Sequence, residues 1–252
     1  IPPGVHRQHR ADVGTPLGEP WPLANHPSDV AAALGVLARD TCRSVGAALQ
    51  VRHHMTHSVH IIVFAKAPVA GLAKTRLIPA LGATGAARLA AVMLKHAVEQ
   101  ALASEVGTVE VCVTPAPDDP MWSELLPQHA ALRISDQGHG DLGERMARAA
   151  QRALDAGHAV LLMGTDCPDL TAERIRMAAA NLLTSDAALV PAFDGGYVLL
   201  ALNRFDASLF RDIAWSTSSV AQVTRSRMGQ LGWSATTLST LHDIDEPDDL
   251  RW

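Results

Sequence analysis

The chain changes character near residue 59, where short apolar runs begin to alternate with stretches of helical spacing. The first run, His60 to Ala65, is rich in β-branched residues, as is typical of a strand buried on both faces of a parallel sheet. Similar runs follow at 109–113, 132–135, 158–163, 187–191 and 197–201. Helical spacing between them covers 83–103, 142–156 and 171–183. This alternation predicts a three-layer α/β/α domain with a mostly parallel central sheet.

Residues 1–58 lack this alternation, because prolines interrupt them and only 29–50 has approximate helical spacing. The segment ends in a histidine-rich stretch, His53, His54, His57 and His60, which is compatible with a metal site but which we interpret as part of a solvated tail. Met55 just precedes the first apolar run and is a candidate start of the functional unit. We expect a poorly ordered extension over 1–58 with one helix, followed by a single domain over 59–252.

Composition limits the class of partner. With 252 residues, 48% of them apolar, the chain can bury one sizeable core, and its net charge of -5 argues against binding to nucleic acid or to an anionic membrane. No apolar run approaches the roughly 18 to 20 residues of a spanning helix, so we expect no membrane span. Cys42, Cys112 and Cys167 lack the spacing of a disulfide framework or a zinc site. We expect a cytoplasmic protein with a small-molecule partner.

Basic residues cluster in the loop after the first run. Lys66, Lys74 and Arg76 lie there, and two of them are among the three lysines of the whole chain. Ligands of open α/β sheets bind beyond the carboxyl ends of the strands, and Gly71 would let backbone amides approach phosphate oxygens. The spacing matches neither a Walker A loop nor a dinucleotide-binding loop. We predict a polyphosphate-binding loop, with merely solvated cations as the alternative.

A second candidate follows the apolar run that ends near Met163. Asp166 and Asp169 come directly after it, and carboxylates in this position often hold Mg²⁺ against substrate phosphates. Asp166 is the leading candidate for a metal ligand. Asp169 is equally well explained as an acid at the start of a helix. Cys167 has no recognisable base beside it, so we interpret it as a packing residue.

The third candidate is the stretch 191–197, where a strand is followed by Asp194, Gly195, Gly196 and Tyr197. Asp194 could reach the same metal ion or the acceptor, and the two glycines would let the main chain pass close to a ligand. A plain hairpin turn is the alternative. Trp215 could border an acceptor pocket, although burial in the core would explain it as well. We predict that Gly195, Gly196, Tyr197 and Trp215 bind the acceptor.

Two further stretches combine glycines or acids with a helix start. Gly140, Asp141 and Arg145 open the helix expected from residue 142, and we predict that they contact the nucleotide. Asp243 and Asp245 precede a helix expected near Pro247, and a capping role is favoured for these acids over a catalytic one.

The order of five motifs resembles one bacterial family: F-A-K-x-P-x-x-G-x-x-K-T-R-L, G-D-L-G-E-R-M, G-T-D-C-P-D-L, P-A-x-D-G-G-Y and D-I-D-E-P-D-D-L. The chain resembles the selenodomain-associated transferase 1 family of the GT-A, or nucleotide-diphospho-sugar transferase, superfamily over about residues 59–250. It is more distantly similar to 2-phospholactate guanylyltransferase and to molybdenum-cofactor nucleotidyltransferases. The resemblance implies a GT-A fold, Lys74 and Arg76 on phosphates, and Asp166 on Mg²⁺.

Three functions are compatible with these features. The favoured function is transfer of a nucleotidyl group from a nucleoside triphosphate to a small phosphorylated or anionic acceptor. In this reaction we expect Lys74, Arg76 and Asp166 to be catalytic and Lys66 and Gly71 to bind the nucleotide. We expect Asp166 and Asp194 to hold Mg²⁺ or Mn²⁺. Glycosyl transfer from a nucleotide sugar is the alternative within the same fold. A non-catalytic nucleotide-binding module is a third interpretation, disfavoured because the cations and the carboxylates are all retained.

Overall fold

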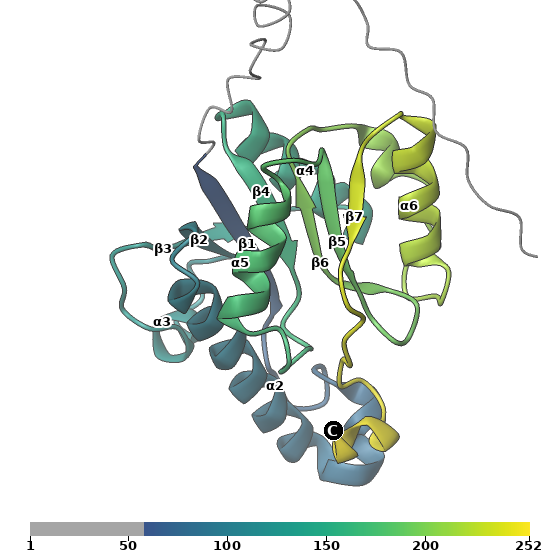
Figure 1. The fold of residues 1–252 in the computed structure, drawn as a ribbon. Coiled ribbons are helices and arrows are strands. Elements are labelled where there is room, and N and C mark those ends of the chain that lie inside the picture. Colours follow the sequence, from purple (N-terminus) through teal and green to yellow (C-terminus); the bar gives the residue numbers. More distant parts are fainter. Residues whose placement is uncertain (1–57) are drawn as a thin grey trace, which may run out of the picture. The chain divides into compact units, whose positions relative to one another are not determined.

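The computed structural model describes residues 58–252, drawn in colour in Figure 1. This range includes every residue of the domain predicted over 59–252. The predicted extension lies outside the described residues except for Ser58, and so do its expected helix over 29–50 and His53, His54 and His57 of the histidine-rich stretch.

A seven-stranded sheet forms the centre of the described part (Figure 1). The strands, in chain order, are β1 (Val59–Lys66), β2 (Gly107–Thr114), β3 (Leu132–Asp136), β4 (Ala159–Met163), β5 (Ala187–Pro191), β6 (Tyr197–Leu202) and β7 (Ala235–Thr237). Their order across the sheet is β3-β2-β1-β4-β6-β5-β7, and only β6 pairs antiparallel to its neighbours. The predicted mostly parallel sheet is confirmed.

Helices cover both faces of the sheet. They are α2 (Ile78–Ala103), α3 (Met121–Leu125), α4 (Leu142–Asp155), α5 (Ala172–Asn181) and α6 (Val220–Gln230), with short 3-10 turns η1 (Thr75–Leu77), η2 (Ala207–Leu209) and η3 (Pro247–Arg251). Buried side chains of α2, α3 and α5 belong to one core cluster, and those of α4 and α6 belong to another. In Figure 1, α2 and α5 lie in front of the sheet and α4 lies behind it. The three-layer α/β/α architecture is confirmed.

The alternation of side chains along β1 explains why this sheet needs two helical layers. Ile61 and Val63 pack into the cluster under α2 and α5, whereas Ile62 packs into the cluster under α4 and α6, and all three are fully buried. Since successive residues of a strand point to opposite faces, an uninterrupted apolar run demands cover on both sides. Burying three side chains of this size contributes on the order of 6 kcal/mol before conformational entropy is counted.

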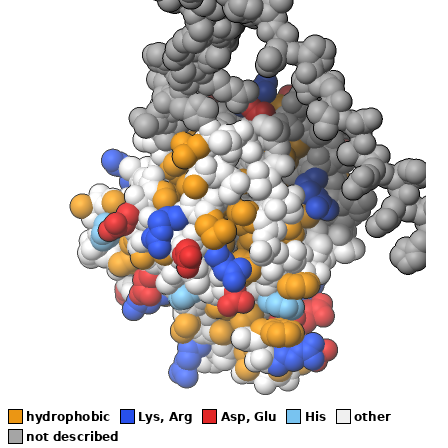
Figure 2. All heavy atoms as spheres, in the orientation of Figure 1, with side chains coloured by type: hydrophobic (Ala, Val, Ile, Leu, Met, Phe, Trp, Pro, Cys, Tyr) orange, Lys and Arg blue, Asp and Glu red, His pale blue; other side chains and the backbone are white. Residues whose placement is uncertain are grey.

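Helix α2 is long and apolar enough, by length and composition alone, to cross a membrane when counted from Thr75 to Ala103. It is not a straight rod, because Gly82 has a positive φ of 70° that interrupts it. One side packs into the core through Ala86, Ala87, Met93, Leu94, Ala97, Val98 and Ala101. Its outer side carries Lys95 beside apolar Val92, and Figure 2 shows apolar side chains spread between charged ones on this face. Helix α2 is one layer of the domain rather than a membrane span.

The reversed direction of β6 matters for the site. Because β6 runs antiparallel, its first residue Tyr197 lies at the same edge of the sheet as the carboxyl ends of β4 and β5. The turn that joins β5 to β6 and carries Asp194 therefore lies at this edge too. The two acid-bearing stretches predicted from the sequence, after β4 and after β5, thus lie at one edge of the sheet. This is the edge at which ligands of such sheets bind.

Some elements differ from the sequence predictions. The helix expected near Pro247 is the five-residue 3-10 turn η3, and α3, α6 and β7 were not predicted. Helix α6 buries only Val220, Ala221, Thr224 and Met228, so its apolar pattern is too sparse to stand out. Strand β7 has three residues and none of them is fully buried, which leaves no apolar run to read.

A buried ionic group under α4 gives a test of the fold. The Glu110 carboxylate on β2 is approached by His60 Nε2 at 2.9 Å and is hydrogen-bonded by Ser135 and Arg152. Burial alone would raise the pKa of Glu110, but the contacts with His60 and Ser135 and the charge of Arg152 outweigh it and hold the pKa below its ordinary value. The group therefore stabilises the fold above the ordinary pKa of a free glutamate, and this contribution is lost as the pH falls through the lowered value.

We predict that Glu110→Gln lowers the free energy of unfolding at pH 7 by about 2 kcal/mol, because Arg152 and His60 lose their charged partner. Urea denaturation measures this change, and the difference from the native sequence should shrink as the pH falls below about 4. Glu124→Gln, at an exposed position on α3, is the matched control and should leave the free energy within about 0.5 kcal/mol. Equal effects of the two substitutions at pH 7 would contradict this account of Glu110.

Candidate functional site

The basic loop after β1 and the C-terminal segment meet through Lys74. Its Nζ lies 2.8 Å from Asp166 Oδ1 and 2.7 Å from Asp245 Oδ1, and it donates a hydrogen bond to the carbonyl oxygen of Ile244 at 2.6 Å. Ile244 in turn donates its backbone N–H to the carbonyl oxygen of Asp166. Three segments far apart in the sequence are therefore joined around one ammonium group. In Figure 1 the C-terminal segment, in yellow, lies beside the start of α2, in blue.

The Lys74 side chain is 8% exposed, so its charge requires compensation. Burial alone would lower the pKa of this ammonium, but the charges of Asp166 and Asp245 outweigh it and hold the pKa above its ordinary value. The backbone of Lys74 is left-handed, with φ 45° and ψ 48°, a conformation that is uncommon for a residue with a side chain. Such a strained residue persists where the surrounding contacts hold it, and here the two ion pairs do so.

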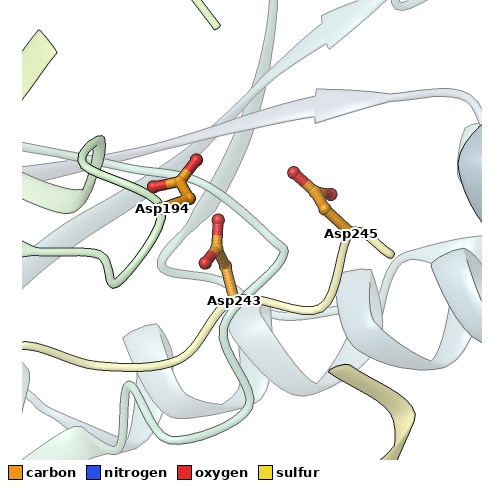
Figure 3. A group of neighbouring side chains, drawn as sticks. All are labelled: Asp194, Asp243 and Asp245. Carbon is orange, nitrogen blue, oxygen red and sulfur yellow. The ribbon is translucent and has the colours of Figure 1, made fainter. Parts of the chain in front are cut away.

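A second group of acids lies next to this ammonium. Asp194, Asp243 and Asp245 each offer a carboxylate oxygen, and these three oxygens lie within 4.8 Å of one another. Figure 3 shows that Asp194 comes from the turn after β5, whereas Asp243 and Asp245 come from the C-terminal segment. Burial raises the pKa of Asp243 to about 6, and the negative charges of Asp194, Asp245 and Asp166 act in the same direction. The group therefore concentrates negative charge that a cation would relieve.

These three carboxylates, which we call the acidic triad, fit a divalent cation by their chemistry. Mg²⁺ and Mn²⁺ take oxygen ligands, and carboxylates are their usual protein ligands. Asp194 is exposed and Asp243 and Asp245 are half-buried, so a bound ion would still be open to water or to a substrate. Asp166 reaches the triad through Lys74, which contacts Asp166 and Asp245 together.

Local backbone geometry sets the position of Asp194. Gly195 has a φ of 91°, and a Cβ atom there would lie 2.1 Å from the backbone oxygen of Ser218, so only glycine fits this turn. The backbone N–H of Gly196 donates to Asp194 Oδ1 at 2.7 Å. Gly195 thus brings the main chain close to Ser218, and Gly196 holds the carboxylate of Asp194 in place.

Aromatic side chains tie the two acid-bearing segments together. Phe193 stacks on His242 with ring centroids 4.0 Å apart, and His242 stacks on Trp252 with centroids 4.2 Å apart. Phe193 precedes Asp194 and His242 precedes Asp243. Stacked rings of this kind contribute roughly 1 kcal/mol per pair beyond the area they bury, so the stack helps to fix the spacing of the acidic triad.

Two adjoining cavities open beside these groups. The larger, of about 590 Å³, has the charged residues Lys66, Lys74, Arg76, Asp166 and Asp245 in its lining; we call it the charged cleft. The smaller, of about 190 Å³, is lined mostly by apolar side chains, among them Met146, Tyr197 and Trp215. Both cavities share Phe64, Leu142, Gly164, Asp194 and Ser216 in their walls.

The predicted site residues divide between these cavities and other roles. Lys66, Lys74, Arg76, Asp166 and Asp194 line the charged cleft, and Asp194, Gly196, Tyr197 and Trp215 line the smaller cavity. Lys66 also donates to the carbonyl oxygen of Leu72 at 3.2 Å, and Arg76 lies 3.7 Å from Glu246. Gly71 and Gly195 do not line either cavity; both have positive φ and shape the turns beside them.

The stretch before α4 forms the start of that helix, as predicted. Asp141 is the N-cap of α4 and accepts a hydrogen bond from the backbone of Glu144, whose side chain accepts one from the backbone of Asp141. Arg145 donates to the carbonyl oxygen of Gly140 and to the Gln137 side chain. Gly140, Asp141 and Arg145 are thus committed to the start of the helix, and none of them lines the charged cleft.

The capping role expected for Asp243 and Asp245 is wrong, because other acids near Pro247 cap the turn η3. In the structure the capping pair is Glu246 and Asp249, which leaves Asp243 and Asp245 free to face Asp194. The signal that could have found them was spacing, since Asp243 and Asp245 precede the proline by four and two residues and therefore lie outside the first turn. Asp169 is exposed, and the N-cap of α5 is Thr171.

Known proteins resemble this chain in sequence and in fold. A family profile described as "Uncharacterized protein conserved in bacteria (DUF2064)" matches residues 97–217. A crystal structure from Desulfovibrio desulfuricans G20, described provisionally as a nucleotide-diphospho-sugar transferase, is 34% identical with a TM-score of 0.71, and the match covers 77% of this chain and 85% of that one. A cytidylyltransferase from Leptospira borgpetersenii is similar in fold, with 14% identity, a TM-score of 0.50, and 77% and 84% of the two chains covered. No curated protein matches the chain.

A double-mutant cycle tests the contact at the centre of the site. We predict that Lys74→Met and Asp245→Asn each lower the free energy of unfolding. The double change should lower it by about 1 kcal/mol less than the sum of the single changes, because each single change leaves the remaining member of the ion pair without its partner. Denaturation at low and high salt provides the measurement. Lys95→Met, on the exposed side of α2, is the matched control and should show no coupling with Asp245→Asn. Additive effects for Lys74 and Asp245 would show that their ion pair is not formed in solution.

Proposed function

We propose that this chain, which belongs to the DUF2064 family of proteins conserved in bacteria, is a metal-dependent nucleotidyltransferase that uses a nucleoside triphosphate. The fold, which is that of nucleotide-diphospho-sugar transferases, supports transfer of a nucleotidyl or sugar group in general. The choice of a nucleoside triphosphate over a nucleotide sugar as the donor is our proposal. The five ordered motifs are our reason for placing the chain among the selenodomain-associated transferases within this family.

One observation carries the proposal. At the carboxyl edge of the strands, four carboxylates gather beside a loop with three cations, and Lys74 links the two sets at 2.8 Å from Asp166 and 2.7 Å from Asp245. A magnesium-bound polyphosphate needs acids for the metal ion and cations for the remaining phosphate charge. Both are present in the wall of one cleft.

The reaction we propose is an in-line substitution at phosphorus. An oxygen atom of the acceptor attacks the α-phosphorus, the bond from that phosphorus to the oxygen bridging to the β-phosphorus breaks, and pyrophosphate leaves with those electrons. Positioning and charge neutralisation provide most of the rate in such reactions. Lys66 and Arg76 are exposed cations in the cleft wall, so we assign them to the polyphosphate. Lys74 holds Asp166 and Asp245 in place, and its ammonium lies within reach of the same cleft.

A divalent cation would be held by Asp194, Asp243 and Asp245, with Asp166 beside them. When bound, Mg²⁺ or Mn²⁺ supplies positive charge to phosphate oxygens and so favours departure of the pyrophosphate. The chain's own acids fix where this charge is available, and the aromatic stack of Phe193, His242 and Trp252 fixes the acids.

Glycosyl transfer is the second candidate, because the 34% identical Desulfovibrio protein is described provisionally as a nucleotide-diphospho-sugar transferase. In that reaction an acceptor hydroxyl attacks the anomeric carbon of a nucleotide sugar, and a nucleoside diphosphate leaves. We favour nucleotidyl transfer because the exposed cations Lys66 and Arg76 lie in the same cleft as the acids that would hold a metal ion, and a triphosphate, with roughly four negative charges, needs both.

The leaving group distinguishes the two reactions. We expect the purified chain, given Mg²⁺, each nucleoside triphosphate in turn and a cell metabolite extract, to release pyrophosphate. Release of a nucleoside diphosphate from nucleotide sugars, without pyrophosphate from any triphosphate, would support glycosyl transfer instead. Tight nucleotide binding with neither product would favour a binding module.

Asp166→Asn tests the role of the acid after β4. We expect this substitution to lower turnover at least a hundredfold, because it removes the carboxylate charge that pairs with Lys74 in the cleft wall. The folded content measured by circular dichroism should stay unchanged. Asp169→Asn is the matched control, since Asp169 is exposed and lies three residues further on. Undiminished turnover in Asp166→Asn would remove this residue from the proposed site.

The metal assignment has its own test, which does not depend on turnover. Asp194→Asn and Asp243→Asn should each weaken Mn²⁺ binding at least tenfold, measured by electron paramagnetic resonance of the free ion in a titration. Asp248→Asn, an exposed acid in η3, should leave the dissociation constant unchanged. If all three substitutions have the same effect, the acidic triad does not hold the ion.

A further inference from the structure

The smaller cavity differs in chemistry from the charged cleft that it adjoins. We call it the apolar chamber. It is partly open and is lined by residues of β1, β4 and β6, of the start of α4, and of the segment that leads into α6. Its apolar lining residues are Phe64, Leu142, Met146, Leu162, Met163, Tyr197, Val198, Trp215 and Val220.

Charge separates the two cavities. Lys66, Lys74 and Arg76 line the charged cleft, whereas no basic residue is among the described residues that line the apolar chamber. Asp194 is the one charged residue in that lining, and it lies on the wall shared with the cleft. An anionic group within the chamber would meet this carboxylate without a cation to offset it, which costs free energy in an apolar surrounding. The chamber is therefore unsuited to phosphate and suited to an apolar group.

Two polar atoms of the chamber's lining residues are left without partners. The Tyr197 hydroxyl and the Trp215 indole Nε1 are buried, and neither has a hydrogen-bond partner among the described residues. Burial also raises the pKa of the Tyr197 hydroxyl, so this group stays protonated and able to donate. A buried donor without a partner costs roughly 1 to 3 kcal/mol, and binding sites are where such groups are commonly found. The Trp215 nitrogen lies against Gly143, outside the chamber lining, so it is the Tyr197 hydroxyl that points to a ligand with a hydrogen-bond-accepting atom.

We propose that the apolar chamber binds the non-reacting body of the acceptor, and that this body is a compact, uncharged, mainly apolar group with an oxygen atom that accepts a hydrogen bond from Tyr197. Only the ligand's role as the acceptor rests on the proposed transfer reaction. The reacting end of the molecule reaches the shared wall of Phe64, Gly164, Asp194 and Ser216, beyond which the nucleotide occupies the charged cleft. The substrate is thus amphipathic, with a polar reacting end and an apolar body.

This class of substrate restricts where the anionic acceptor expected from the sequence can carry its charge. Any negative charge on the acceptor belongs at its reacting end, next to Lys66, Lys74 and Arg76, and not on the body that enters the chamber. A cavity of about 190 Å³ that is partly open admits a ring system or a short branched chain, but it is too small for a nucleotide together with an acceptor.

Direct binding of small probes tests the inference without any turnover. We would titrate the full chain with acetophenone, with ethylbenzene, which has the same shape without the oxygen, with benzoate, and with benzyltrimethylammonium, using saturation-transfer NMR. We expect acetophenone to bind about fivefold more tightly than ethylbenzene, and benzoate to bind more weakly than either. Preference for benzoate or for the ammonium probe would overturn the proposal, and so would displacement of acetophenone by a nucleoside, since the chamber would then hold the base.

Two variants locate the probe. Tyr197→Phe should remove the advantage of acetophenone over ethylbenzene while leaving the affinity for ethylbenzene unchanged, and it should fold well because the lost hydroxyl has no partner among the described residues. Trp215→Phe should weaken both probes, whereas Trp233→Phe, at a buried tryptophan outside the chamber lining, is the matched control and should weaken neither. An unchanged preference for acetophenone in Tyr197→Phe would overturn the role of the hydroxyl.

Probe binding and turnover can fail separately. If the probes bind as expected but no triphosphate releases pyrophosphate, the ligand class proposed for the chamber is supported and the proposed nucleotidyl transfer is wrong. If a triphosphate turns over but the probes bind no better than to Trp215→Phe, the reaction stands and the acceptor class proposed here is wrong.

Discussion

The contact between Lys74 and the carboxylates of Asp166 and Asp245 is the interaction on which the site depends. It joins the loop after β1, the end of β4 and the C-terminal segment, and it offsets the charge of acids that would otherwise repel one another. The central strands place two of these segments at one edge of the sheet, and the antiparallel β6 brings Asp194 to the same edge. The charge of this buried lysine thus determines how closely the acids can gather.

The sheet and its helical layers follow from the sequence because two-sided burial leaves an unmistakable pattern. Strands β1 to β6 appear as apolar runs, and the observed ends differ from the predicted ones by at most two residues. Helix α6 and strand β7 left no such pattern, since few of their side chains are buried. The positions of the cations and of Asp166 were also foreseeable, because ligands of such sheets gather beyond the carboxyl ends of the strands.

What the sequence did not decide is which of several similar acids and glycines does which task. Asp141 and Arg145 were expected at the nucleotide, and they form the start of α4. Asp243 and Asp245 were expected to cap a helix, and they face Asp194, whereas Glu246 and Asp249 do the capping. A capping acid and a ligating acid look alike in sequence, and only the path of the chain through space separates them. That path depends on contacts with distant residues, such as the stack of Phe193 on His242.

A charged cleft lies beside an apolar chamber, with Asp194 in the shared wall, and the function proposed here uses the cleft for the nucleotide and the chamber for the acceptor. The central claim is that the acids and the cations of this site hold the same metal-bound nucleotide. The most direct measurement is electron-nuclear double resonance of Mn²⁺ added to the chain with an α,β-methylene triphosphate analogue. The account predicts strong ³¹P coupling from phosphates bound to the ion, which disappears in Asp243→Asn. Mn²⁺ bound to the chain without any phosphorus coupling, while the analogue is bound as well, would contradict it.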